Sequence, residues 1–321
     1  MRRVNHIGLI GLVFVFLGMS LATVSYALTI AVVKSQDIEA YNLALDGIRE
    51  ALSGTSAGKD VEVWIAADLQ GAKRLPFSAI DSIKVKAPAL ILALGSAATT
   101  AVQKEFPNIP IVFCMVLNPV ASGFIKSIHA SGNNLTGASL DIPVETQFRE
   151  LLSVLPRVKR IGVIYNLEEN REVINEASLI AKGMGLELVT AVVGSEKAVP
   201  DALDDLIKKV DALWSVSDNI VFTPQSIQYV LLTTLRNEMP FMGISPSYVK
   251  AGALMALSCD YKDVGRQAGE VANRVIAGEQ PNNIPITAPR RVYLSLNSIA
   301  AEQIRITIPS DVTARAKEIF K

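Results

Sequence analysis

Ala89–Pro119, ALILALGSAATTAVQKEFPNIPIVFCMVLNP, contains two buried strands and the helix that joins them. Ala89–Leu94 and Ile111–Val116 are unbroken apolar runs, which is typical of parallel strands covered by helices on both faces. After the first run a glycine lets the backbone turn, and Ser96 is expected to cap a helix that runs to about Phe106. This stretch therefore predicts a β-α-β unit of an open parallel sheet.

The turns after these two strands are candidates for contact with a ligand. In an open parallel sheet, ligands bind outside the carboxyl ends of the strands, where free helix N–H groups and hydroxyls point into a crevice. The first turn carries Ser96 and Ala97, and the second carries Asn118 before a proline. Gly-Ser and Asn-Pro are also ordinary turn residues, so this unit alone leaves both interpretations open.

The size and composition of the chain bound what it can be. Its 321 residues suggest about two domains, and a hydrophobic fraction of 50% with 19% charged residues is enough for a full core. Lys plus Arg equals Asp plus Glu, so the formal net charge is zero. A nucleic-acid-binding protein normally has a basic surplus, and this balance argues against that class.

The N-terminus has the pattern of a secretory signal peptide. Arg2 and Arg3 precede the apolar run Ile7–Val24, which is followed by Ser25-Tyr26-Ala27, with small residues at the two positions that a signal peptidase reads. We expect residues 1–27 to be removed by cleavage after Ala27, which places the protein in a bacterial periplasm. The alternative is an uncleaved membrane anchor, because about 18 apolar residues almost span a bilayer. No cysteine follows the run, so a lipid-modified N-terminus is not expected.

The rest of the chain alternates between strands and helices in two successive sets, which predicts an α/β protein with two doubly wound parallel-sheet lobes. The strands expected besides those above are Leu28–Val33, Val61–Ala66, Asn134–Leu140, Arg160–Tyr165, Glu187–Val193, Ala212–Val216, Phe241–Ile244, Ala251–Leu257 and Arg291–Leu296. The helices expected include a long one over roughly Glu169–Met184 and an amphipathic one over Tyr261–Gly278. Two lobes of similar size imply a cleft between them, where small ligands often bind.

Residues for catalysis or metal binding are scarce. His129 is the only histidine after the signal segment, so a Ser-His-Asp triad, a Cys-His pair and a His-rich metal site are not expected. An exported protein can form a disulfide, but Cys114 and Cys259 both read more naturally as small core hydrophobes. Carboxylate-only chemistry has no positive support. We therefore expect no cofactor, no metal and no enzymatic activity.

Polar residues without reactive partners follow nearly every strand in both sets. Hydroxyls, amides and helix termini of this kind orient a ligand, and a carboxylate can pair with an ammonium group. Each one is also an ordinary cap or turn residue, but their recurrence favours a binding site. The candidate ligand-binding residues are Ser35, Gln36, Ser96, Ala97, Asn118, Asp141, Tyr165, Asn166, Asp218, Asn219 and Ser245.

Five segments carry a resemblance to a known family over essentially the whole chain after residue 27. They are NIPIVFCMVLNPVASG at Asn108–Gly123, GNNLTGASLDIP at Gly132–Pro143, SVLPRVKRIGVIYNLEEN at Ser153–Asn170, VDALWSVSDN at Val210–Asn219, and VKAGALMALSCDYKDVGRQAGEVANRVIAGEQP at Val249–Pro281. In this order the chain resembles the periplasmic substrate-binding proteins of the tryptophan/tyrosine-type ABC importer family, which have the type I periplasmic-binding-protein fold.

The resemblance implies how the lobes are connected. The helix Tyr261–Gly278 would cross back to pack on the first lobe, and the last strand would return to the second, giving a three-stranded hinge. The first lobe would then contain residues 28–141 and about 261–280, and the second 142–260 and about 281–321. In such proteins ligand binding closes the lobes, and the membrane permease recognises the closed form.

The sequence departs from the family pattern at three places near the expected site. Arg171-Glu172 stands where family members commonly carry Asn-Ser, Gly-Ser follows Leu94 in place of Thr-Pro, and Asp68–Lys73 lacks an Asn-Ala-Gln-like run. The expected ligand is therefore described only as a small, polar, amino-acid-like solute.

These observations predict a monomeric periplasmic receptor that delivers its ligand to an ABC permease. For an amino acid, Asp218 is expected to hold the ammonium group, and Ser96 with neighbouring helix N–H groups the carboxylate. A sensor whose closed form engages a signalling membrane protein is the alternative for the same fold.

Overall fold

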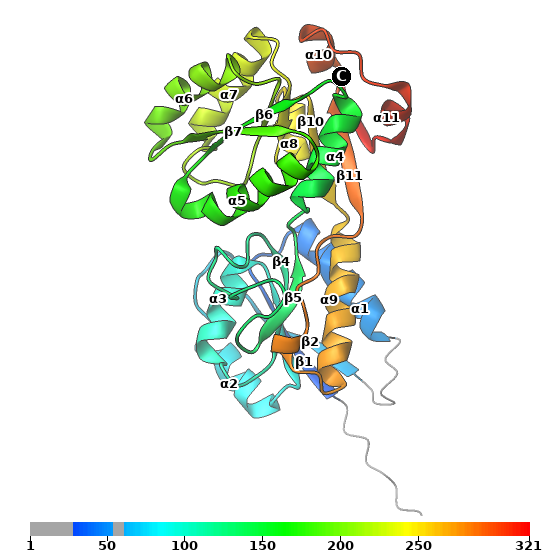
Figure 1. Ribbon diagram of the computed structural model, residues 1–321. Helices are drawn as coiled ribbons and strands as arrows, with labels where there is room; N and C mark the ends of the chain where they lie inside the picture. Colours follow the sequence, from blue (N-terminus) through cyan, green and yellow to red (C-terminus); the bar gives the residue numbers. More distant parts are fainter. Residues whose placement is uncertain (1–27, 54–60) are drawn as a thin grey trace, which may run out of the picture.

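The protein folds into two α/β lobes, one above the other, as the computed structural model shows (Figure 1). The structure describes residues 28–53 and 61–321. The predicted signal peptide, residues 1–27, lies outside the described residues. Among the described residues, no helix combines the length and the apolar composition needed to cross a membrane.

The first lobe is built on a five-stranded parallel sheet. Its spatial order is β2 (Val61–Asp68), β1 (Leu28–Lys34), β3 (Leu90–Leu94), β4 (Ile111–Val116) and β5 (Leu135–Ser139). Its early helices are α1 (Glu39–Ser53), α2 (Phe77–Lys86) and α3 (Ser96–Glu105). Alternate residues of a strand face opposite sides, so Ile30 packs with α1 while Ala31 packs with α2 and α3.

The second lobe has a seven-stranded sheet that is parallel except between β10 and β11. Its order is β12 (Glu318–Phe320), β11 (Val292–Asn297), β10 (Met255–Cys259), β9 (Phe241–Gly243), β8 (Ala212–Trp214), β6 (Arg160–Tyr165) and β7 (Glu187–Val192). Its helices are α4 (Val144–Val154), α5 (Leu167–Gly183), α6 (Val199–Ile207), α7 (Pro224–Arg236), α8 (Pro246–Lys250), α10 (Ser298–Gln303) and α11 (Ser310–Arg315). A short 3-10 turn at Glu196–Ala198 precedes α6. A second 3-10 turn, Pro281–Asn283, lies beside the first sheet.

Helix α9 (Tyr261–Ile276) follows the second-lobe strand β10 but packs on the first lobe, against α1 and the sheet. The helices approach to backbone contact through glycines. A Cβ on Gly265 would lie 1.9 Å from the carbonyl oxygen of Ala44, and one on Gly47 would lie 1.9 Å from that of Lys262. The predicted return of this helix to the first lobe is therefore confirmed, and small residues are what make it possible.

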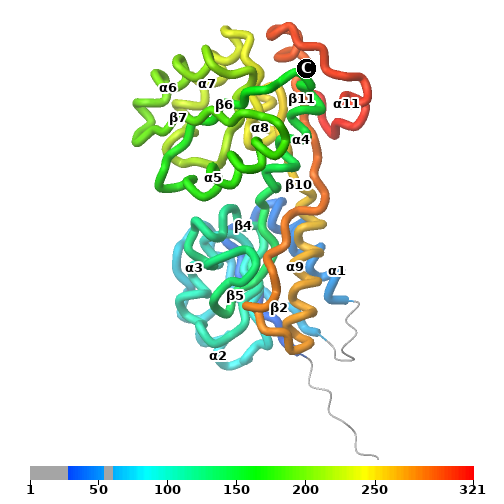
Figure 2. Tube along the Cα trace, in the orientation of Figure 1, coloured from blue at the N-terminus to red at the C-terminus, as the bar shows by residue number. Residues whose placement is uncertain are grey.

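The chain passes between the lobes three times, as the trace in Figure 2 allows the reader to follow. It leaves β5 for α4, returns from β10 to α9, and leaves again before β11. Residues 281–287 lie against the first sheet, where Thr287 pairs with Ala138. These contacts put the last passage after Thr287, whereas the sequence-based division put it at about residue 281.

These passages decide which edges of the sheets face each other. The chain enters the second lobe directly after the carboxyl end of β5, so that end of the first parallel sheet points towards the second lobe. It re-enters the first lobe directly after the carboxyl end of β10, so that end of the second sheet points back. The carboxyl edges, where ligands bind in open α/β sheets, therefore face one another.

The sequence-based prediction differs from the structure in the bounds of one strand and in several short elements that it missed. The strand expected at Ala251–Leu257 is β10, Met255–Cys259, because the first part of that run turns out of the unpredicted helix α8. The terminal elements α10, α11 and β12 were also not predicted. Cys114 and Cys259 are free and buried, which confirms their interpretation as core residues.

We predict that Gly265→Ala lowers the free energy of unfolding by about 3 kcal/mol, because a methyl group cannot fit against the Ala44 carbonyl without separating α1 from α9. Gly183→Ala is the control, since a Cβ at that helix end meets nothing within 4 Å. Urea unfolding of both variants measures the difference. Equal midpoints would contradict the role given to the α1–α9 contact.

Candidate functional site

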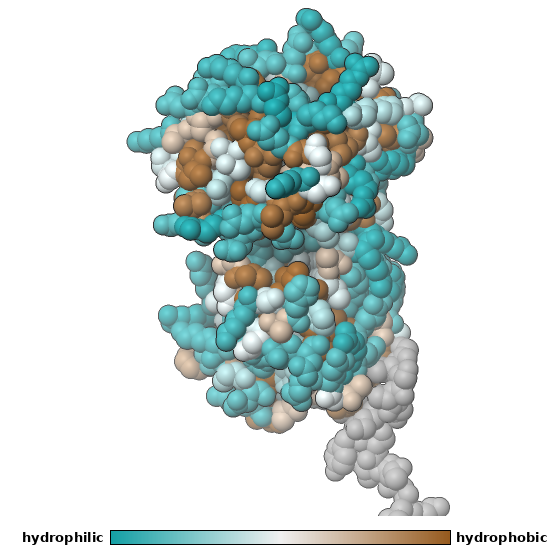
Figure 3. Space-filling model, viewed as in Figure 1, coloured by the Kyte–Doolittle hydropathy of each residue, from teal (hydrophilic) through white to brown (hydrophobic). Residues whose placement is uncertain are grey.

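The candidate site lies where the two carboxyl edges face each other. Figure 3 shows the surface hollowed between the lobes, with hydrophobic side chains on both sides of the hollow. Exposed apolar residues follow strands of both sheets at these edges: Ile38 after β1, Leu117 and Val120 after β4, and Ile244 after β9. Among the described residues, no hydrogen bond or salt bridge joins the lobes across this hollow, and those that connect the lobes lie at the three passages.

The first group of predicted residues surrounds the N-terminus of α3. The helix is not capped by Ser96, as the sequence suggested, because Ser96 is already its first residue and Gly95 occupies the N-cap position. The hydroxyl of Ser35, at the end of β1, accepts a hydrogen bond from the N–H of Ala98 instead, at 2.9 Å. A neighbouring strand therefore supplies the cap that the helix lacks.

Gly95 makes this arrangement possible. Its φ of +89° lies in a region that favours glycine, and a Cβ there would come within 2.5 Å of the Tyr41 hydroxyl and 2.6 Å of the Ser35 hydroxyl. Tyr41 was not predicted as a site residue, and burial raises the pKa of its hydroxyl. The N–H groups of Ser96 and Ala97 have no hydrogen-bond partner among the described residues, so the first turn of α3 presents two donors.

A buried lysine lies at the same edge and was also missed. Lys34 ends β1 and is 5% exposed. Its ammonium group donates to Asp37 Oδ1 at 2.7 Å and to Asn42 Oδ1 at 3.2 Å, and lies 3.6 Å from Asp68 Oδ2. A lysine that directly follows an apolar strand was the available signal. Gln36, in contrast, is exposed beside the turn at Gly71.

Asn118 and Asp141 are brought together next to the first passage between the lobes. Both carboxylate oxygens of Asp141 accept from the N–H of Asn118 at 3.0 Å, and Ser139 donates its hydroxyl to one of them at 2.9 Å. Asn118 has a φ of +46°, which asparagine tolerates better than most residues. Burial raises the pKa of Asp141, against the lowering effect of these hydrogen bonds. This carboxylate therefore holds the turn after β4 in place.

The second lobe brings Asn166, Asp218 and Asn219 together around the start of α5. Asn166 caps α5 through hydrogen bonds from the N–H groups of Glu168 and Glu169. Glu169, on that first turn, accepts from the main-chain and side-chain N–H groups of Asn219 at 2.8 and 3.2 Å. The loop after β8 is thus tied to the helix after β6.

Asp218 is 4% exposed and accepts four hydrogen bonds from its own chain. One oxygen accepts from the N–H of Asn166 and the side-chain amide of Asn170, at 2.6 and 2.9 Å. The other accepts from the N–H groups of Ile220 and Val221, at 3.0 and 2.9 Å. A carboxylate has about four lone-pair sites, so these four hydrogen bonds use them all. Asp218 therefore holds this edge of the sheet together, and its predicted contact with an ammonium group stays a prediction.

Asn170 was missed by the sequence analysis. It is 1% exposed, and its Oδ1 has no hydrogen-bond partner among the described residues, while its amide group donates to Asp218 and to Ser217. Nothing in the local pattern distinguished it from other polar residues of the helix. A buried acceptor without a partner is unfavourable by about 1–3 kcal/mol, which makes Oδ1 receptive to an N–H donor.

The two remaining predicted residues are Tyr165 and Ser245. The side chain of Tyr165 lies in the core of the second lobe, and Ser245 occupies the N-cap position of α8 without a side-chain hydrogen bond to the helix. Among residues 28–53 and 61–321, no three histidine, cysteine, aspartate or glutamate residues are grouped so that they could hold a metal ion.

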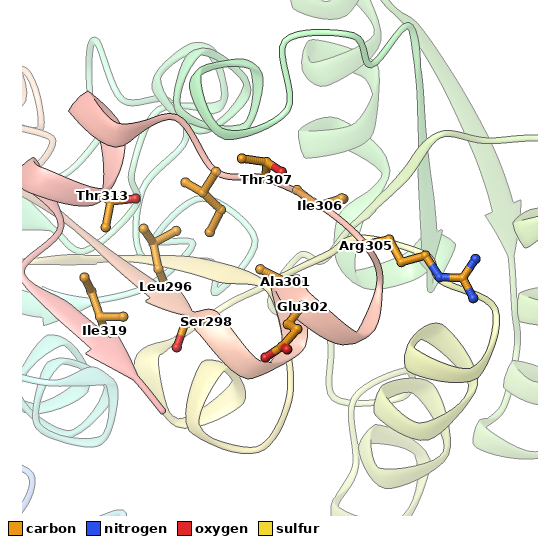
Figure 4. A pocket seen from close by; sticks show the side chains of 10 residues that line it. Leu296, Ser298, Ala301, Glu302, Arg305, Ile306, Thr307, Thr313 and Ile319 are labelled. Carbon is orange, nitrogen blue, oxygen red and sulfur yellow. The ribbon is translucent and has the colours of Figure 1, made fainter.

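A second hollow, of about 460 Å³, lies elsewhere in the second lobe (Figure 4). Its floor includes Leu296, Ile306 and Ile319, with Glu302 and Arg305 at its side. Leu296 pairs with Met255, the first residue of the antiparallel neighbour β10. This hollow is therefore at the amino end of β10, away from the edge that faces the first lobe.

Residues 29–320 match the family model described as ABC transporter substrate binding protein. The chain belongs to this family. This substrate-binding protein is 30% identical to a tyrosine-binding protein of Clostridioides difficile (strain R20291) over 210 residues, which is 65% of this chain and 60% of that relative. The match thus spans less than two thirds of the relative's length. The family suggested by the sequence motifs is confirmed.

Two solved structures show the same fold. The ligand-free, open structure of a substrate-binding protein with adhesive properties from Clostridium difficile covers 92% of this chain and 100% of its own, with 23% identity and a TM-score of 0.72. The complex of an ABC domain with L-Trp from Streptococcus pneumonia has the same coverages, 21% identity and a TM-score of 0.62. The expected architecture, two α/β lobes of the periplasmic-binding-protein type, is therefore correct.

We predict that Asp218→Asn lowers the free energy of unfolding by about 3 kcal/mol, because the new amide group opposes backbone N–H donors that a carboxylate satisfied. Asp204→Asn on α6 is the control, since that residue is exposed. Chemical unfolding of the ligand-free variants gives both values. If Asp218→Asn is as stable as the control, the organising role of Asp218 is wrong.

Proposed function

We propose that this substrate-binding protein captures a small, polar, amino-acid-like solute between its lobes and delivers it to an ABC permease. The observation that carries the proposal is the pair of facing carboxyl edges, one with open donors on α3 and the other with the Asp218 and Asn170 cluster. A zwitterion has a carboxylate for the first and an ammonium group for the second. No chemical step is required of any residue.

The carboxylate of the ligand would meet the first turn of α3. Its N–H groups at Ser96 and Ala97 carry the positive end of the helix dipole, which favours an anion. The Ser35 hydroxyl keeps this turn in place through Ala98. Asn118, whose main chain is fixed by Asp141, lies at the end of β4 on the same edge.

The ammonium group would meet the second lobe. Asp218 contributes its negative charge, and Asn170 Oδ1 is an acceptor that no protein group uses. The exposed apolar residues Leu117, Val120 and Ile244 would then cover the apolar part of the ligand. Binding groups on both lobes favour a closed, ligand-bound form, which is the form a permease would recognise.

The transport context is part of the proposal. ABC substrate-binding proteins work outside the cytoplasm, which agrees with the signal peptide predicted for residues 1–27. We propose that the protein acts as a monomer in the periplasm, with the permease as its partner. Uptake of the identified ligand by cells with and without the gene tests delivery, and equal uptake would contradict it.

The ligand is identified by thermal unfolding with a panel of amino acids, purines, sugars and small carboxylates. L-tyrosine and L-tryptophan are included because a relative is named a tyrosine-binding protein and a structural neighbour holds L-Trp. We expect a selective shift of a few degrees from an amino-acid-like compound, because a ligand at about 100 times its Kd adds roughly 2.7 kcal/mol. Mass spectrometry of the denatured protein first excludes a copurified ligand. No shift from emptied protein would contradict the proposal.

We predict that Ser96→Pro weakens binding of the ligand by about 10- to 100-fold, because it removes one N–H that bonds the carboxylate. Proline is tolerated at the first position of a helix, and the ψ of 163° at Gly95 suits a residue before proline. Ser96→Ala, which removes only the hydroxyl, is the control. Isothermal titration measures both, and unchanged affinity in Ser96→Pro would exclude α3 from the site.

A further inference from the structure

A network of charged side chains lies at the hinge. Its centre is Asp263, on the first turn of α9, which is 2% exposed. Its carboxylate accepts from Arg266 at 2.8 Å and from two nitrogens of Arg290, at 3.0 and 3.2 Å. Arg291 Nε lies 3.8 Å from Asp263 Oδ1. A buried carboxylate with this number of cationic partners is strongly held, and removing a partner is costly.

Arg290 belongs to the last passage of the chain between the lobes, before β11. Besides Asp263, it donates to both carboxylate oxygens of Glu270, at 3.0 and 2.9 Å. Asp263 and Glu270 are both on α9, which is packed on the first lobe. The guanidinium group therefore fastens the passage to the first lobe up to residue 290.

The residues that follow Arg290 are hydrogen-bonded to the neighbouring passage, the one between β10 and α9. The N–H of Asp260 donates to the carbonyl of Arg291 at 3.2 Å, and the hydroxyl of Tyr293 donates to Asp260 Oδ2 at 2.8 Å. Asp260 lies between β10 and α9. Two of the three passages are thus joined side by side, and any rotation of the lobes must bend them next to Arg290.

We propose that the Asp263–Arg290 pair is the positioning element that fixes the pivot of the two lobes and so limits how far they separate without ligand. Across the front of the molecule, no hydrogen bond or salt bridge between described residues opposes separation. The three chain passages and the network beside them are therefore where the relative orientation of the lobes is restricted. Gln267 of α9 also holds this passage, because it donates to the carbonyl of Ala288 at 2.8 Å and accepts from the N–H of Arg290 at 3.3 Å. Loss of the Arg290 guanidinium group therefore loosens the passage only at its end next to β11, where the lobes then sample a wider range of separations.

This pair affects affinity without touching the ligand. A ligand held by both lobes must select the fraction of molecules whose lobes are close enough, and a smaller fraction raises the apparent Kd in proportion. Breaking the pair should therefore weaken binding by about tenfold. This consequence rests on the proposed function, whereas the wider separation does not.

The experiment measures the distance between spin labels on the two lobes of the purified, ligand-free protein. The labels are placed on Lys104→Cys in α3 and Glu176→Cys in α5, both exposed positions. Burial raises the pKa of the native thiols, to about 12 for Cys114 and about 11 for Cys259, so they do not compete for the label. Double electron–electron resonance then gives the distance distribution.

We expect Asp263→Asn and Arg290→Gln to broaden this distribution relative to the parent. Arg290→Gln is included because it leaves Asp263 paired with Arg266 and so disturbs folding less. The matched control is Arg274→Gln. It breaks the salt bridge between Arg274 Nη2 and Glu279 Oε1, which are 2.6 Å apart at the far end of the same helix. A role in stability alone would lower the unfolding temperature without changing the distribution.

An unchanged distribution in Arg290→Gln, or equal broadening in Arg274→Gln, would overturn the proposal. Affinity is measured with L-tyrosine and L-tryptophan, using whichever binds the parent protein. A tenfold loss in Arg290→Gln with no loss in Arg274→Gln supports the coupling, and equal affinity contradicts it. If neither amino acid binds the parent protein, L-tyrosine and L-tryptophan are excluded as ligands, and the distance measurement still decides the hinge proposal.

Discussion

The backbone contact between α1 and α9 is the constraint on which the rest of the structure depends. Gly47 and Gly265 let the two helices touch at their main chains, so a helix that follows a strand of the second lobe becomes part of the first. The burial of α9 residues such as Val264 and Val271 in the first lobe's core stabilises this arrangement. It acts together with the contacts of α9 and of residues 281–287 with the first sheet.

This return of the chain has a consequence for function. Since the chain leaves each parallel sheet at its carboxyl end, both carboxyl edges must point into the space between the lobes. The same edges carry helix N-termini and polar loops, which suit a charged, hydrogen-bonding ligand. The second hollow lacks this setting, because β11 is antiparallel to β10 and brings Leu296 to the opposite edge.

Much of the fold could be predicted because buried parallel strands have an unambiguous pattern. Ile111–Val116 and Arg160–Tyr165 agree with the structure to the residue. Short elements such as α8 and β12 were missed because three to five residues carry too little periodicity to be recognised. For the candidate site, the sequence located the polar residues at strand ends, but not which of them are already occupied by other groups of the protein.

The sequence by itself determined the alternation of strands and helices, the two lobes, the family and the strand ends where polar residues gather, because these follow from local patterns and motifs. Only the tertiary structure decided how those polar groups are used. Asp218 is fully occupied by donors from Asn166, Asn170 and its own loop, and Ser35 caps a helix 63 positions later in the chain. Such pairings depend on which distant segments the sheet brings together, and no local pattern contains that information.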